Sequence, residues 1–132
     1  MASIPAAYRD LFERETFAAF ATVMPDGTPQ VTPVWIDFDG EHLVVNTARG
    51  RQKERNVRSN PRVGVMAMDP ADPYRYLSVR GAVVEVTEAG AVEHANELAR
   101  RYMGVDQYPN LGEEQGPRVM LLVRPDRVIA SG

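Results

Sequence analysis

The 132-residue sequence contains no cysteine, which excludes disulfide bonds, thiolate metal sites and a cysteine nucleophile. It also has no apolar run near the roughly 18 residues that a membrane-spanning helix requires. Its first fifteen residues lack the basic start and the apolar centre of a signal peptide. These absences predict a cytoplasmic protein that does not bind to or cross a membrane.

The sequence also lacks an excess of positive charge. The chain has 15 Lys and Arg against 18 Asp and Glu, a net charge of −3, whereas nucleic-acid-binding domains are usually basic. We therefore expect no nucleic-acid partner. Lysine is the rarest basic residue, because Lys53 is the only one and every other basic residue is an arginine.

Motifs for side-chain catalysis and metal binding are missing. The sequence contains neither G-x-S-x-G nor H-E-x-x-H, the signatures of serine hydrolases and zinc proteases. His42 and His94 stand apart, both are expected at the surface, and neither has a second ligand at metal spacing. We expect no catalytic side chain and no metal site.

The first half of the chain has the pattern of β-hairpins. Residues 16–24 and 29–38 flank Asp26-Gly27, and an Asp-Gly pair between two apolar runs is a strong hairpin signal. A second pair, Asp39-Gly40, precedes another strand at residues 43–47. This spacing predicts three strands in an antiparallel meander.

The second half adds strands and one clear helix. Apolar spacing predicts a helix at residues 91–103 that Gly104 ends, and Gly81 is expected to form a bulge in a long strand. The other predicted elements are a short N-terminal helix at 5–14, strands at 62–69, 74–88 and 117–124, an edge piece at 128–129, and loops at 70–73 and 105–116. Together they predict one domain over residues 1–132, a mainly β, six-stranded antiparallel barrel with short flanking helices.

The segment Asn46–Pro61 concentrates the positive charge. It contains a single acid, Glu54, among five basic residues: Arg49, Arg51, Lys53, Arg55 and Arg58. A turn with free backbone N–H groups that leads into a basic helix is a favourable site for phosphate or carboxylate. The alternative is a solvated helix face with scattered arginines.

Four stretches in this order resemble a known family. They are DGTPQVTPVW, LVVNT, ARGRQKERNVRSNPRVGV and YLSVRGAVVEV, and the similarity extends over nearly the whole chain. The pattern resembles the pyridoxamine-5′-phosphate-oxidase-like split β-barrel family, which has the FMN-binding fold, and within it the branch of F420-dependent oxidoreductases. The most specific part is R-x-K-x-x-N followed by a strand after N-P-R-V.

The resemblance implies a homodimer with a cofactor site at each interface. The cofactor would be coenzyme F420, a deazaflavin with a phosphate and an oligoglutamate tail. The implied phosphate site comprises Arg51, Gln52, Lys53 and Asn56; the implied ring site comprises Thr32, Pro33 and Val34; and the rest of the pocket comprises Asn46, Thr47, Met66 and Tyr76.

The implied reaction is hydride transfer to a small electron-poor substrate such as an enone or imine, with a proton from solvent or from Tyr76. Hydride transfer is the cofactor's own chemistry, so no side-chain nucleophile is needed. Two alternatives stay open. One is an FMN-dependent enzyme of the same fold, although the longer basic motif of the FMN oxidases is not found here. The other is a non-catalytic carrier of a cofactor or a tetrapyrrole-like ligand.

Three other positions allow two interpretations each. Trp35 alternates with Pro33 and is expected in the core or a dimer interface rather than stacked on a ring. Met66 and Met68 suit ordinary packing better than contact with substrate. Arg80 could pair with the cofactor tail or with a neighbouring glutamate.

Overall fold

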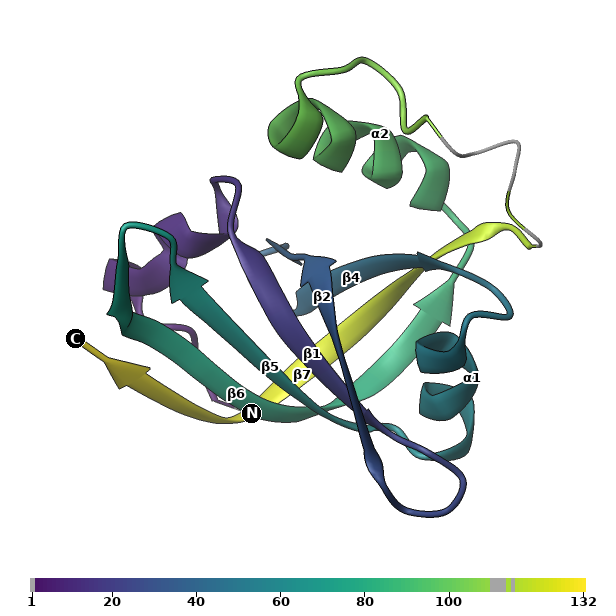
Figure 1. The fold of residues 1–132 in the computed structure, drawn as a ribbon, viewed down its shortest axis with the longest axis horizontal. Helices are drawn as coiled ribbons and strands as arrows, with labels where there is room; N and C mark the ends of the chain where they lie inside the picture. The colour runs from purple at the N-terminus through teal and green to yellow at the C-terminus, as the bar shows by residue number, and fades with distance from the viewer. Residues whose placement is uncertain (1, 110–113, 115) are drawn as a thin grey trace.

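The computed structural model describes residues 2–109, 114 and 116–132, and shows one strongly curled sheet with helices around it (Figure 1). Within this part of the chain the sheet has seven strands in the order β2-β1-β5-β6-β7-β4-β3, and every pair is antiparallel. The elements are η1 (Ala6–Phe12), β1 (Phe17–Val23), β2 (Pro29–Trp35), β3 (Asp37–Phe38), β4 (Leu43–Ala48), α1 (Gln52–Ser59), β5 (Arg62–Asp69), β6 (Asp72–Thr87), α2 (Ala91–Met103) and β7 (Arg118–Ser131). The predicted antiparallel split barrel is confirmed, with the two-residue β3 as an additional strand.

The core lies inside the curl of this sheet. Alternate residues of β7 point inward, so that Val119, Leu121 and Val123 are completely buried. Phe20 of β1 and Leu77 of β6 contribute to the same apolar cluster. The period-two alternation of these strands therefore produces one filled interior.

The predicted strand 29–38 is divided at Ile36. Ile36 is buried, and its backbone N–H donates to the hydroxyl of Tyr102, 3.1 Å away, instead of to a neighbouring strand. Before this point β2 pairs with β1, and after it β3 pairs with β4. The predicted meander is therefore wrong here: β4 pairs with β7, and β2 and β4 approach each other without pairing. This gap is the split in the barrel.

The expected bulge at Gly81 is confirmed. The register of β6 shifts between Arg80 and Gly81, and a Cβ atom on Gly81 would clash with the carbonyl oxygen of Arg124. Pro125 stands opposite this bulge, where its missing N–H costs no regular ladder bond. As a result β7 passes through Pro125 as one strand, although the sequence pattern predicted two pieces.

The helices differ from expectation mainly at the N-terminus. α2 has the predicted bounds, and Gly104 ends it with φ of +69°. The N-terminal segment forms a 3₁₀ helix rather than an α-helix. β6 begins at Asp72, which shortens the predicted loop at 70–73. Of the predicted loop at 105–116, residues 110–113 and 115 lie outside the described part of the chain.

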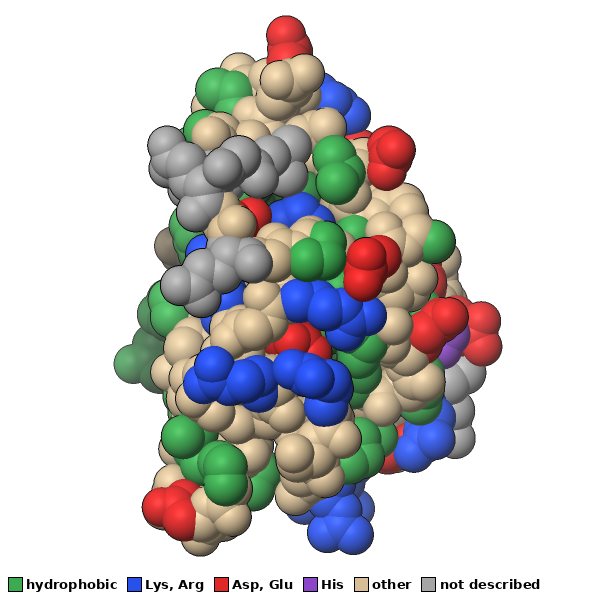
Figure 2. Space-filling model, turned by 90° about the vertical axis from the view of Figure 1, so that its right-hand side faces the viewer, with side chains coloured by type: hydrophobic (Ala, Val, Ile, Leu, Met, Phe, Trp, Pro, Cys, Tyr) green, Lys and Arg blue, Asp and Glu red, His purple; other side chains and the backbone are tan. Residues whose placement is uncertain are grey.

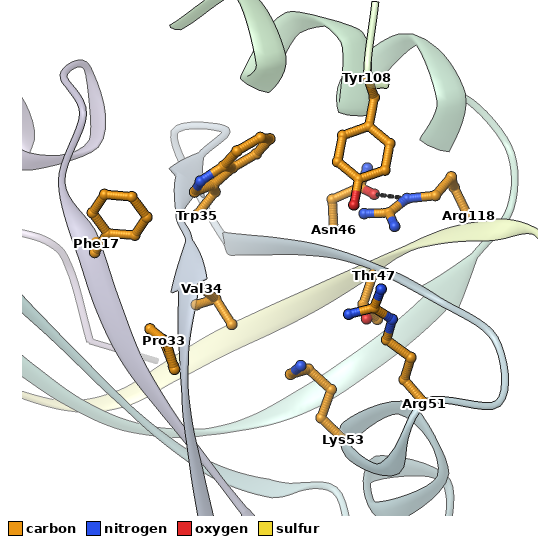
Figure 3. Close-up of a pocket in the computed structure, with 10 residues that line it drawn as sticks. All are labelled: Phe17, Pro33, Val34, Trp35, Asn46, Thr47, Arg51, Lys53, Tyr108 and Arg118. Carbon is orange, nitrogen blue, oxygen red and sulfur yellow. Dashed lines mark hydrogen bonds between the residues drawn. The ribbon is translucent and has the colours of Figure 1, made fainter. Parts of the chain in front are cut away.

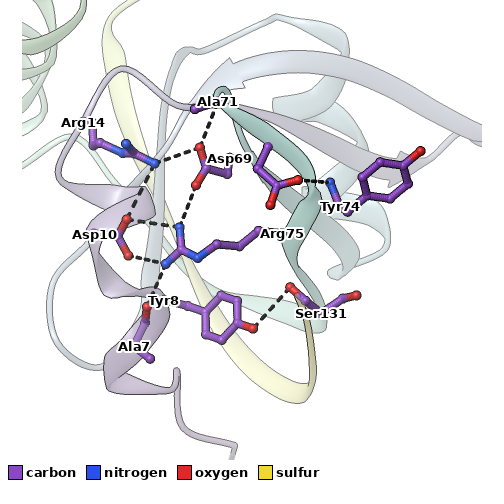
Figure 4. Close-up of polar contacts among 10 residues, drawn as sticks. Ala7, Tyr8, Asp10, Arg14, Asp69, Ala71, Tyr74, Arg75 and Ser131 are labelled. Carbon is purple, nitrogen blue, oxygen red and sulfur yellow. Dashed lines mark hydrogen bonds and ion pairs between the residues drawn. The ribbon is translucent and has the colours of Figure 1, made fainter.

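An arginine fastens η1 to the β5–β6 hairpin (Figure 4). The guanidinium of Arg75 donates to Asp10 at 2.6 Å, to Asp69 at 2.9 Å and to the carbonyl of Ala7 at 2.7 Å, and it lies over the ring of Tyr8. Its hydrogen bonds lower the pKa of Asp10. The N–H of Ala71 and then Arg75 lower the pKa of Asp69.

Acid should weaken this attachment. A carboxyl whose pKa is lowered by folding contributes stability above its unfolded pKa, near 4, and loses it as the pH falls further. We predict that Arg75→Met lowers the free energy of unfolding at neutral pH and flattens its decline below about pH 4. Urea unfolding at several pH values measures both effects. Arg127→Met, an exposed arginine with no ion pair among the described residues, is the control, and an equal effect of the two changes would contradict the prediction.

Candidate functional site

The gap between β2 and β4 forms a pocket (Figure 3). Its floor is built from the last residues of both strands, and its sides come from β1, the start of α1, the start of β7 and the segment after α2. The residues that line it are Phe17, Pro33, Val34, Trp35, Asn46, Thr47, Arg51, Lys53, Tyr108 and Arg118. The pocket is therefore a direct consequence of the incomplete closure of the barrel.

The two sides of the pocket differ in chemistry. Pro33, Val34 and Trp35 of β2 provide an apolar side. The opposite side carries Arg51, which directly precedes α1, Lys53 from α1 and Arg118 from β7 (Figure 3). Such a site suits a ligand that has a flat apolar part and an anionic part.

The buried Glu54 determines which basic residues are free to face the pocket. Its side chain is fully buried and accepts a hydrogen bond from the N–H of Gly50 at 2.8 Å. It also pairs with Arg58 at 2.6 Å and with Arg49 at 3.6 Å, and Arg49 binds Glu88 at 2.9 Å as well. The sequence analysis expected the N–H groups of this turn to be free for an anionic ligand, but the N–H of Gly50 donates to Glu54 instead.

Arg51 and Lys53 have different surroundings. Within the described part of the chain, Arg51 makes one ion pair, with Glu114 at 3.3 Å. Lys53 has no carboxylate within ion-pair distance among the described residues, and its ammonium reaches toward Val34 and Pro33 (Figure 3). Burial, together with the charges of Arg51 and Arg118, lowers the pKa of Lys53. On the surface, Lys and Arg side chains gather over the face where α1 lies (Figure 2).

Arg118 is a site residue that the sequence analysis missed. It is almost buried, and its Nε donates to Oδ1 of Asn46 at 2.8 Å. Its Nη1 pairs with Glu114 at 2.7 Å, and its guanidinium lies 4.4 Å from the ring centre of Tyr108. Only the pairing of β4 with β7 brings Arg118 beside Asn46, and no local pattern reports that register.

Aromatic rings form the upper end of the pocket. Trp35 stacks on Tyr102 with the ring centres 5.0 Å apart, and Tyr108 meets it edge-on at 5.9 Å. Trp35 thus lines the pocket while it packs on α2, and it is half-buried rather than part of the core. Its alternation with Pro33 was the available signal, because both point to the same side of β2.

The structure brings together six of the eleven predicted site residues and leaves five elsewhere. Those that line the pocket are Pro33, Val34, Asn46, Thr47, Arg51 and Lys53. Thr32 and Met66 lie in a separate shallow hollow over β1, β2 and β5. Tyr76 is half-buried on β6, opposite Ser131.

Gln52 and Asn56 face away from the pocket, toward the β1–β2 hairpin. Asn56 is buried, and its amide donates to Thr22 at 2.9 Å, while Gln52 donates to Asn56 at 2.7 Å. These bonds fasten α1 to β1. Because they occupy the amide of Asn56, its contribution is to hold the helix in place.

Two further findings concern metals and membranes. Within residues 2–109, 114 and 116–132, no group of three or more His, Asp or Glu side chains is arranged to hold a metal ion. In the same part of the chain, no helix has the length and apolarity needed to span a membrane.

The fold is a split β-barrel, and the pocket in the split has basic side chains on one side. The family model of pyridoxamine 5′-phosphate oxidase matches residues 4–132, and the chain belongs to this family. No curated protein sequence matches the chain.

Solved structures extend the comparison. The chain is similar to a protein named F420 reductase, with 39% identity, a TM-score of 0.83, and coverage of 96% of this chain and 98% of that one. A conserved hypothetical protein from Mycobacterium tuberculosis shares 25% identity with a TM-score of 0.78, over 99% of this chain and 86% of that one. HupZ of Group A Streptococcus, at 20% identity and a TM-score of 0.66 over 96% and 93% of the two chains, shows the fold alone.

The electrostatics of Lys53 predict a stability effect. Since its ammonium is partly buried beside two other cations, removing the charge should relieve repulsion in the ligand-free protein. We expect Lys53→Met to raise the free energy of unfolding by about 0.5–1 kcal/mol. Urea denaturation measures this change. Arg62→Met, an exposed arginine outside the pocket, should have little effect, and a clear loss of stability in Lys53→Met would contradict the expectation.

Proposed function

We propose that the chain is an oxidoreductase that binds coenzyme F420 in the split of the barrel. The main support is the 39% identity, over nearly the full length of both chains, to a protein named F420 reductase. The family match also favours a flavin or deazaflavin as the cofactor. The pocket itself provides the second line of support.

The residues present fit such a cofactor. Arg51 and Lys53 stand at one side of the pocket. Lys53 has no carboxylate partner among the described residues, so a phosphate would give it one, and Arg51, which also pairs with Glu114, lies beside it. Pro33 and Val34 provide apolar contacts opposite them, which suits a tricyclic ring. The pocket thus separates the two chemical parts that a deazaflavin combines.

A bound deazaflavin would supply the hydride chemistry, and the protein would supply position and charge. Arg51 and Lys53 would hold the phosphate, while Trp35 would help to exclude water from the ring. The substrate would be a small electron-poor molecule of the enone or imine type. Tyr76 does not line the pocket, which favours solvent as the source of the proton.

Removal of Lys53 tests the cofactor site. Lys53→Ala should weaken the binding of F420 by about 1.5–3 kcal/mol, the range for a lost hydrogen bond to a charged group. Titration of purified protein with F420, followed by fluorescence, measures the affinity. Arg62→Ala is the charge-matched control, and unchanged affinity in Lys53→Ala would remove Lys53 from the site.

The same titration with FMN distinguishes the alternatives. We expect wild-type protein to bind F420 more tightly than FMN and to reduce enones when reduced F420 is supplied. Tighter binding of FMN would favour an FMN enzyme of the same fold. Tight binding of F420 with no turnover on a panel of enones and imines would favour a carrier.

We also propose a homodimer formed through an apolar patch that adjoins the pocket. The patch comprises Phe17, Val31, Met66 and Met68 on β1, β2 and β5, and Phe17 also lines the pocket. Val31 is 61% exposed and Phe17 is 60% exposed, on and beside the edge strand β2. An uncharged patch that can pack on its own copy suits a two-fold interface.

A charge in this patch should separate the subunits. Val31→Asp is expected to raise the dimer dissociation constant by at least about tenfold, because a buried interface charge would lack a partner. Sedimentation velocity over a concentration series measures it. Val84→Asp alters a similarly exposed valine outside the patch, and a wild-type monomer at all concentrations would refute the proposed dimer.

A further inference from the structure

Both polar atoms of the Asn46 amide already have partners within the protein, although the residue lines the pocket. Its Oδ1 accepts from Nε of Arg118 at 2.8 Å. Its Nδ2 lies 2.8 Å from the carbonyl oxygen of Ala91 and 3.0 Å from Nδ1 of His94. The neighbours fix the orientation of the amide from both sides, because an arginine nitrogen only donates and a carbonyl oxygen only accepts.

His94 is buried rather than at the surface as expected, and the orientation of the Asn46 amide determines which of its ring nitrogens carries the proton. The amide nitrogen of Asn46 is a donor, so Nδ1 of His94 must accept and cannot carry a proton. The proton of the neutral ring is then on Nε2, which lies 2.9 Å from the carboxylate of Asp37. Each group thus donates to the next along one chain, from Arg118 through Asn46 and His94 to Asp37.

The chain is anchored at the end far from the pocket. Burial alone would raise the pKa of Asp37, but hydrogen bonds from His94 and from the N–H of Phe38 lower it, and so does the charge of Arg101. Asp37 also pairs with Arg101 at 3.2 Å. The carboxylate is therefore a stable acceptor that holds the imidazole in one orientation.

We propose that His94 is a positioning residue, which acts through Asn46 to orient Arg118 for the anionic part of the ligand. The inference rests on the proposed function for the identity of that ligand. Without the acceptor on His94, the amide of Asn46 is free to reverse and to present its NH₂ to Arg118. Two donors would then face each other, and the guanidinium would lose its contact at Nε, while those to Glu114 and Tyr108 would remain.

NMR of the ligand-free protein tests the chain of bonds without any cofactor. Long-range ¹H–¹⁵N spectra should show His94 with a protonated Nε2 and a bare Nδ1. The Nε–H of Arg118 should exchange slowly with water, and at least about tenfold faster in His94→Ala. A proton on Nδ1, or unchanged exchange in the variant, would overturn the proposal.

A double-mutant cycle tests the effect on binding. His94→Ala should weaken the binding of F420 about tenfold in wild-type protein and hardly at all in an Arg118→Ala background, because the two residues act as one unit. His94→Gln, which keeps an acceptor for Asn46 and a donor for Asp37, should restore most of the affinity and guards against a folding defect. His42→Ala is the matched control, because His42 contacts Asp39 in the hairpin turn outside the pocket.

The outcomes separate this inference from the proposed function. Equal losses from His94→Ala in both backgrounds would reduce His94 to a packing role and overturn the inference. Failure of wild-type protein to bind F420 would instead contradict the proposed function. In that case the NMR measurements, which give the tautomer of His94 and the rate at which the Arg118 Nε–H exchanges with water, still decide whether the hydrogen-bond chain exists.

Discussion

The buried carboxylate of Glu54 is the interaction on which the charge of the site depends. It binds Arg49 and Arg58 and also the N–H of Gly50, so it both neutralises two cations and closes the turn before α1. Arg51 and Lys53 are left to face the opposite way, into the split of the barrel. Glu54 thus pairs with two of the basic residues of the segment, while two others line the pocket.

The split coincides with a single contact between α2 and the sheet. Tyr102 of α2 takes the backbone N–H of Ile36, which ends β2 and allows β3 to join β4. The same tyrosine stacks on Trp35, so one residue of α2 both opens the gap and shapes its aromatic end. The fold and the pocket are therefore two results of one contact between the helix and the sheet.

Much of this arrangement could be predicted from the sequence, and the remainder could not. The period-two pattern of residues 62–69 and the helical spacing of 91–103 gave correct bounds, because both signals are local. The resemblance placed Pro33 and Lys53 in one site, and both line the pocket. Asn46 and Arg118 are 72 residues apart and meet only through strand register, and the division at Ile36 depends on a hydroxyl 66 residues away. Contacts between residues so far apart produce no periodic pattern in the sequence from which they could be predicted.

The most direct test of the account is a crystal structure of the protein with coenzyme F420 bound. The account predicts that the phosphate of the cofactor lies within hydrogen-bond distance of Arg51 and Lys53, and that the ring lies against Pro33 and Val34 in the gap between β2 and β4. A cofactor bound on another face, with Lys53 extended into solvent, would contradict it.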